Sequence, residues 1–188
     1  MSTPRTPPPA ALVVSVFAAQ AETIEEALLL LTERFGPPAE VSGLIPFTET
    51  SYYAREFGAP LLRRFVAFAT LVAQDSLADI KLACLGLEAQ LTSGGKRRAN
   101  IDPGLLSAER LVLATGKNYT HRIPLKGGIF ADLTLIFTRG SYQTLPWTYP
   151  DYRAPAIIDL LNGFRAGYIE RLRGRGLSGE EGNRCSEA

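Results

Sequence analysis

The spacing of hydrophobic residues predicts short strands that alternate with amphipathic helices. β-Rich or alternating segments predict strands at residues 13–17, 41–47, 64–71 and 97–102. Spacings of three and four predict a helix at 23–35, opened by a capping box at Thr23 to Glu26, and a second helix at 77–91. This strand-helix-strand-strand-helix-strand order is typical of the ferredoxin-like arrangement, in which two helices cover one face of a four-stranded antiparallel sheet.

The remaining pattern predicts a C-terminal extension of this core. It contains a helix at 107–115, a β-hairpin at 121–138 and a last helix at 155–172. The fold class is therefore α+β: a ferredoxin-like βαββαβ core with a C-terminal helix, β-hairpin and helix extension. We expect residues 1–10 to form a disordered proline-rich leader, 11–172 a single domain and 173–188 a disordered tail.

The hairpin allows an expectation about register. Its turn must fall at Lys126-Gly127-Gly128, and a two-residue turn would place Ile123 opposite Asp132. A three-residue loop keeps apolar residues together and sets opposite charges across from each other, so we expect that register. Its pairs are Leu125 with Ile129, Ile123 with Ala131, and Arg122 with Asp132. His121 would then lie on the side of Ile123, Leu133 and Leu135.

Composition and charge limit the classes of function. The chain has 188 residues, 46% of them hydrophobic, which is enough to bury a core. Its 20 Lys and Arg against 19 Asp and Glu leave a net charge of +1, which argues against a bulk polyanion binder. No apolar run approaches the roughly 20 residues of a membrane span. With two distant cysteines, a core Cys84 and a tail Cys185, we expect a cytoplasmic protein with no membrane.

The first candidate cluster lies between Gly94 and Gly104. If Ala99 and Ile101 face the core, then Arg98, Asn100 and Asp102 share the open face of the predicted sheet, next to Lys96 and Arg97. The glycine spacing is not that of a phosphate-binding loop. The cluster is either an anion site or a charged surface strand that ends in an Asp-Pro-Gly turn.

The second cluster is Lys117-Asn118-Tyr119-Thr120-His121-Arg122. Its cationic and hydrogen-bonding groups are dense enough to hold a phosphate or carboxylate, unless the Arg122 guanidinium is already paired with the carboxylate of Asp132. Otherwise it is a solvated connecting turn. His121 is the one histidine in the chain, and it is either a half-buried structural residue or the source of any imidazole chemistry.

The third cluster is the aromatic and proline-rich segment from Leu145 to Arg153. Trp147, Tyr149 and Tyr152 surround Asp151 and could wall a pocket, or they could pack the last helix onto the sheet. A weaker candidate is the long connection at 48–60 with Tyr52 and Tyr53, which has the length of a lid or binding loop.

Five segments together resemble the bacterial and archaeal family called domain of unknown function 4416. The resemblance covers nearly the whole folded unit and implies that the three clusters form one recurring pattern. It implies no activity, cofactor or partner, and it assigns no catalytic role. The segments that carry it are Gly95–Arg98, Asn100–Gly104, Leu113–Arg122, Gly128–Asp132 and Leu145–Arg153.

The clusters predict a pocket for a small anionic ligand that bears phosphate or carboxylate, with no metal site. Hydrolysis or transfer of a phosphorylated metabolite would suit it, with Asp102, His121 and Asp151 as candidate catalytic residues. The alternative is a module that binds single-stranded RNA or a protein through the open sheet face. The expected ligand-binding residues are Lys96, Arg97, Arg98, Asn100, Lys117, Asn118, Arg122, Trp147, Tyr149 and Tyr152.

Overall fold

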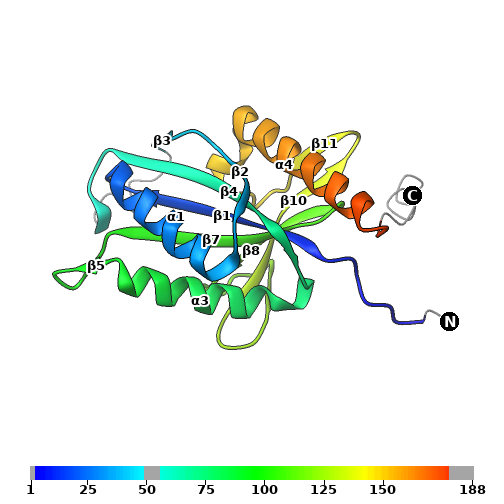
Figure 1. Cartoon of the computed structure of the whole chain (residues 1–188), viewed down its shortest axis with the longest axis horizontal. Coiled ribbons are helices and arrows are strands. Elements are labelled where there is room, and N and C mark those ends of the chain that lie inside the picture. Colours follow the sequence, from blue (N-terminus) through cyan, green and yellow to red (C-terminus); the bar gives the residue numbers. More distant parts are fainter. Residues whose placement is uncertain (1–2, 49–55, 178–188) are drawn as a thin grey trace.

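The computed structural model describes residues 3–48 and 56–177, which form an antiparallel sheet with helices on both faces (Figure 1). Within these residues the sheet has nine strands: β1 (Ala10–Ala18), β2 (Pro38–Val41), β3 (Ile45–Phe47), β4 (Leu61–Val72), β7 (Ala99–Leu106), β8 (Arg110–Thr115), β9 (Arg122–Pro124), β10 (Phe130–Thr138) and β11 (Ser141–Thr144). The helices are α1 (Ala21–Phe35), α3 (Leu77–Gln90) and α4 (Pro155–Gly174), with the short 3-10 turns η1 (Gln74–Ser76) and η2 (Pro150–Arg153). The class is α+β, and the sheet is larger than the four strands expected.

The main path of the sheet runs β11-β10-β8-β7-β1-β4-β2, with β3 also paired to β4 and β9 to β10. Helices α1 and α3 cover one face. Strand β1 is buried on both sides, and its even-numbered residues, such as Leu12 and Val14, pack beneath these helices with Ile24 and Ile80. Alternation along the strand turns Ala11 and Val13 to the other face.

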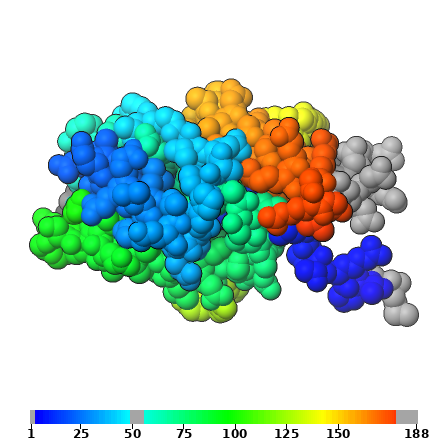
Figure 2. Space-filling model, viewed as in Figure 1, coloured from blue at the N-terminus to red at the C-terminus, as the bar shows by residue number. Residues whose placement is uncertain are grey.

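That other face is covered along part of its area by α4, so it is less open than expected. The apolar stripe of α4, which includes Leu161 and Phe164, packs on Phe65, Leu111 and Leu135 of the sheet. In Figure 2, α4 forms the orange surface at the upper right of the molecule. The surface available to RNA on this face is correspondingly smaller.

The helix expected at 107–115 is wrong, because this segment is strand β8. Leu111 and Leu113 contact the α4 side of the sheet, whereas Val112 and Ala114 contact the α1 and α3 side. A strand buried on both faces is apolar at every position, so its periodicity cannot be distinguished from that of a short buried helix. Ser107 resembles a helix cap because its Oγ accepts a hydrogen bond from the Glu109 N–H, within a hairpin turn.

Two other local expectations also need correction. The expected 41–47 strand is divided into β2 and β3. Helix α1 begins at Ala21, before the expected cap, and Thr23 is buried and accepts a hydrogen bond from Arg98 Nη2 at 3.1 Å. The turn expected at Asp102-Pro103-Gly104 lies inside β7, and Gly94-Gly95 instead joins the two-stranded hairpin of β5 (Thr92–Ser93) and β6 (Lys96–Arg97).

The register of the 121–138 hairpin is confirmed. Ile123 pairs with Ala131, and Arg122 pairs with Asp132. The Leu125 N–H donates to the Ile129 carbonyl at 2.8 Å, which closes the expected loop. The expectation for His121 is wrong. Its Nε2 lies 3.3 Å from Asp132 Oδ2, on the Arg122 side, because the carboxylate offers a partner that the apolar side lacks.

The sheet divides between β7 and β8. These strands pair only at Gly104–Leu113, Leu105–Val112 and Leu106–Leu111, next to their hairpin turn. Gly104 allows the close approach, since a Cβ there would lie 2.6 Å from Leu113 Cδ2. Pro103 precedes it and has no N–H to donate to a ladder. Beyond this point β7 continues along β1 and β8 continues along β10, so a wedge opens between them.

The ends of the described chain extend past the core. Residues 3–8 are exposed and project from the body in Figure 2, while β1 begins at Ala10 and α4 ends at Gly174. The tail expected at 173–188, with Cys185, lies outside the described residues from 178 onward. Across the described helices, none has the length and apolar character needed to cross a membrane.

Candidate functional site

A cleft of about 580 Å³ occupies the wedge between β7 and β8. Helix α3 borders it on one side, and the start of β4 and the η2 segment border it on the other. Its size is that of a small-molecule site. The lining residues are Phe17, Phe47, Glu56, Arg63, Lys81, Leu85, Arg97, Asn100, Asp102, Leu113, Ala114, Thr115, Gly116, Lys117, Arg122, Tyr149, Asp151 and Tyr152.

Two charged side chains of α3 support the open edge of β7. Lys81 Nζ donates to the carbonyl of Ile101 and to Oδ1 of Asp102, both at 2.9 Å. Glu88 Oε1 accepts the Ile101 N–H at 2.7 Å. Burial by itself would lower the pKa of Lys81, but Asp102 and Glu88 outweigh it and raise the pKa above its usual value. Lys81 is therefore a fixed positive charge at neutral pH.

Arg97 joins this wall to the rim of the cleft. Its Nη1 donates to Glu88 at 2.7 Å, and Nε and Nη2 donate to the two carboxylate oxygens of Glu56 at 2.8 and 2.9 Å. The hydrogen bonds to Glu56 raise the pKa of Arg97 despite its partial burial. Asn100 donates to Asp102 Oδ2 at 2.7 Å and so fixes the second oxygen of that carboxylate.

Arg63 is a buried cation held in one orientation. Only 4% of the residue is exposed, its Nε donates to Ser15 Oγ at 2.6 Å, and its Nη1 donates to Asp151. The rings of Phe47, Phe65 and Tyr152 lie 4.6 to 4.9 Å from its guanidinium carbon. Within the described part of the chain, Nη2 has no hydrogen-bond partner. A guanidinium held in this way is preorganised for an anion.

A second network fixes Arg122. Its Nε donates to Asp132 Oδ2 at 2.8 Å, and Nη2 donates to the hydroxyl of Tyr149. Asp132 is 1% exposed, and it also contacts His121. Asp132 therefore pairs with the Nε edge of the Arg122 guanidinium, as the register of the hairpin predicted, and holds the cation at the cleft wall.

The cleft gathers many of the residues singled out in the sequence, and the three clusters meet there. Asn100 and Asp102 share the β7 face that alternation predicted. The other expected residues that line the cleft are Arg97, Lys117, Arg122, Tyr149, Asp151 and Tyr152.

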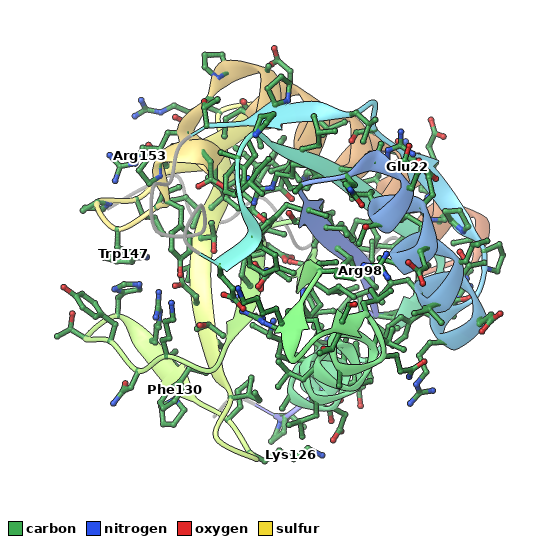
Figure 3. All side chains as sticks on the ribbon, turned by 90° about the vertical axis from the view of Figure 1, so that its left-hand side faces the viewer. Glu22, Arg98, Lys126, Phe130, Trp147 and Arg153 are labelled. Carbon is green, nitrogen blue, oxygen red and sulfur yellow. The ribbon has the colours of Figure 1, made fainter. Side chains whose placement is uncertain are left out.

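Five expected residues do not line the cleft: Lys96, Arg98, Asn118, His121 and Trp147. Arg98 precedes β7, and its Nη2 donates to Glu26 Oε2 of α1 at 2.6 Å, away from the face of Asn100 and Asp102. Trp147 stacks on His121 with ring centroids 5.1 Å apart, and its Nε1 donates to the Leu133 carbonyl. Figure 3 shows Arg98 beside α1 and Trp147 well apart from it on the far loop. Tyr52 and Tyr53 lie outside the described residues.

Arg63, Lys81 and Glu88 were not predicted to be site residues, although the hydrophobic pattern around each one places it at a core-facing position. Lys81 and Glu88 lie four and eleven residues after Leu77, on the helix stripe that faces the sheet. Arg63 alternates with Phe65 and so points to a buried face of β4. A charge at a core-facing position needs a partner or a function, because leaving it unpaired is costly.

Tyr149 contributes to the pH dependence of stability in the alkaline range, together with the buried Tyr142, Tyr152 and Tyr168, whose pKa values burial also raises. Burial, followed by the nearby Asp132 charge, raises the pKa of Tyr149 from 10 to about 12. The unfolded chain loses this proton near pH 10 while the folded chain keeps it, so its contribution to stability is present below pH 10 and is lost towards pH 12. We expect urea midpoints to fall between pH 9.5 and 11.5, and to fall less steeply in Tyr149→Phe. An equal slope in that variant would contradict this assignment.

No metal centre is indicated within the part of the chain that the structure describes, because no three His, Cys, Asp or Glu side chains lie together in a position to hold an ion. Cys84 is fully buried in the core, as expected. Burial raises the pKa of its thiol to about 12, so the reactive thiolate is suppressed.

Comparison with known proteins identifies a family. Neither a curated protein nor a solved structure matches the chain. The family model described as domain of unknown function (DUF4416) matches residues 8–168. This match spans all strands of the sheet, every residue that lines the cleft and most of α4. The chain therefore belongs to the DUF4416 family.

Proposed function

We propose that the cleft between β7 and β8 binds a small molecule that carries a phosphate or carboxylate group. The observation that carries the proposal is the convergence of positive charge in a concave site of suitable size. Among the described lining residues, five are cationic, Arg63, Lys81, Arg97, Lys117 and Arg122, and three are acidic, Glu56, Asp102 and Asp151.

The cations differ in what they offer a ligand. Arg97 and Arg122 direct their guanidinium donors mainly to carboxylates, the Lys117 carbonyl and Tyr149, so they shape the wall. Arg63 bonds to Ser15 and Asp151 through Nε and Nη1, and its Nη2 has no hydrogen-bond partner among the described residues. Lys117 lines the cleft two residues after the end of β8. We assign the anionic group to the part of the cleft that Arg63 borders, because a charge-assisted hydrogen bond from a fixed guanidinium is strong and also orients the anion.

The charge balance favours one anionic group. Glu88 and Asp132 hydrogen-bond to Arg97 and Arg122 from behind the lining, so five acidic groups lie in or directly behind the described cleft wall beside its five cations. Such a site attracts a compact anion locally but has no large positive field for a polyanion. This and the cover of α4 over the sheet disfavour the RNA alternative.

The finer parts of the sequence expectation remain proposals. Asp102 and Asp151 line the cleft and are candidates for acid-base roles in hydrolysis or transfer, although both carboxylates are engaged by cations. We also propose a ferredoxin-like relationship for residues 10–106. It is supported by the strand order β7-β1-β4-β2, with α1 and α3 on one face.

A matched pair of lysine variants tests the proposal. Lys117→Gln removes a cation from the cleft lining, whereas Lys96→Gln removes an exposed cation that does not line the cleft. Using inorganic phosphate and a panel of phosphorylated and carboxylated metabolites in thermal-shift and calorimetric titrations, we expect at least one anion to bind. We expect Lys117→Gln to weaken it about tenfold and Lys96→Gln to leave it within about twofold.

Two outcomes would overturn the proposal. One is that no anion in the panel raises the melting temperature of the folded protein, since a ligand selective for the folded state must stabilise it. The other is equal binding by the wild type and Lys117→Gln while both remain folded.

A further inference from the structure

The main chain of β8, as well as its side chains, borders the cleft. Five consecutive residues line it: Leu113 to Thr115, which end β8, and Gly116 and Lys117, which follow the strand. Side chains of a strand alternate between two faces, so side chains on one face would contribute only every second residue. An unbroken run indicates that the strand's edge is presented to the cleft.

The hydrogen-bond register identifies which edge groups point there. The Ser107 N–H donates to the Arg110 carbonyl at 2.9 Å in the β7–β8 turn. Successive residues in an antiparallel ladder direct their main-chain groups alternately to the two neighbouring strands, so those of Val112 and Ala114 point towards β7. Continuing the register places Pro103 opposite Ala114.

Pro103 has no N–H, so the ladder cannot supply a donor to the carbonyl of Ala114. Extending this alternation one residue past the end of β8, into the bend at Gly116, would direct the N–H of Gly116 to the same side. Across the wedge, the carbonyl of Ile101 already accepts from Lys81, and its N–H already donates to Glu88. The β8 edge therefore offers an acceptor at Ala114 and a donor at Gly116, two residues apart.

We propose that this edge binds the amide-type edge of a planar heterocycle, in which a ring N–H or exocyclic NH₂ adjoins a ring nitrogen or carbonyl acceptor. Together with the anionic group of the proposed function, on which this inference rests, that chemistry is a nucleobase with a phosphate, as in a mononucleotide. Tyr149 lines the same cleft with a half-buried ring that a base could contact, whereas the rings of Phe17, Phe47 and Tyr152 in the lining are buried. The base donates to the Ala114 carbonyl and accepts from the Gly116 N–H.

Two variants at Gly116 test the donor. A Cβ at Gly116 meets no atom within 4 Å, and the residue does not have a positive φ, so Gly116→Ala is a matched control that keeps the N–H. Gly116→Pro removes the N–H, and the preceding Thr115 is in the extended conformation that proline requires of its neighbour. In calorimetric titrations with AMP, GMP, UMP and CMP, we expect Gly116→Pro to weaken the best ligand about tenfold relative to Gly116→Ala.

A second arm changes the ligand and leaves the protein intact, so it does not depend on the folding of the proline variant. We expect a base methylated on its donor nitrogen, N3-methyl-UMP or N6,N6-dimethyl-AMP, to bind about tenfold more weakly than its parent. With ¹⁵N-labelled wild type, the parent nucleotide should shift the Gly116 amide resonance.

The outcomes separate the two proposals. Equal binding of the parent and methylated bases, or of the two Gly116 variants, would overturn the base assignment and leave anion binding standing. Preference for an acetylated dipeptide carboxylate over all four nucleotides would also overturn it, in favour of a peptide main chain at this edge. If no anion binds at all, the proposed function fails as well.

Discussion

Replacing Arg63 with methionine is expected to lower the free energy of unfolding by roughly 3–5 kcal/mol, because removal of one partner leaves a buried charge unpaired. The charge is Asp151, whose side chain is 11% exposed and which contacts Arg63 Nη1. Methionine fills much of the same volume, so the loss reports charge and hydrogen bonding more than a cavity. Urea unfolding monitored by circular dichroism measures it.

The double variant Arg63→Met with Asp151→Asn is the control. It removes both charges, so we expect much of the lost stability to return while binding of the anion does not. Return of binding together with stability would show that Arg63 acts only through the fold. A loss below about 1 kcal/mol in the single variant, the range of exposed ion pairs, would contradict the buried pairing.

Asp132→Ala is expected to cost about 3 kcal/mol of stability, since Arg122 loses its buried partner and His121 loses a contact. The matched control is Asp159→Ala, an exposed carboxylate on α4, for which we expect a change within about 0.5 kcal/mol. Urea unfolding measures both.

A second readout separates the local network from general loss of stability. The Asp132 charge helps to raise the pKa of Tyr149, after burial, so its removal should lower that pKa from about 12 towards 10. Ultraviolet titration of tyrosinate, with Tyr149→Phe subtracted, follows this group. An unchanged Tyr149 titration in folded Asp132→Ala would contradict the network.

Much of the fold could be predicted because local patterns and the final packing agree. Leu77, Ile80 and Cys84 mark α3 by spacing alone, and the charges of Arg122 and Asp132 select the register of their hairpin. Strand β8 could not be predicted in this way. It is buried between helices on both faces, so tertiary contacts, not periodicity, decide its conformation.

The candidate site was predictable where alternation along one strand places side chains together, as it does for Asn100 and Asp102. It was not predictable where distant elements meet. Arg98 precedes Asn100 by two residues, but its hydrogen bond to Glu26 of α1 directs its side chain away from the cleft. Lys81 reaches Asp102 because β8 leaves β7 at that point, and no local pattern reports such a separation.

The short β7–β8 ladder also determines how the molecule is mechanically divided at the cleft. On one side, β7 is bound along its length to β1 and carries α3; on the other, β8 is bound to β10. Three residue pairs and one turn join β7 directly to β8. A molecule held between Arg63 and the end of β8 would contact both sides, so it would act as a cross-link where the sheet's own hydrogen bonds stop.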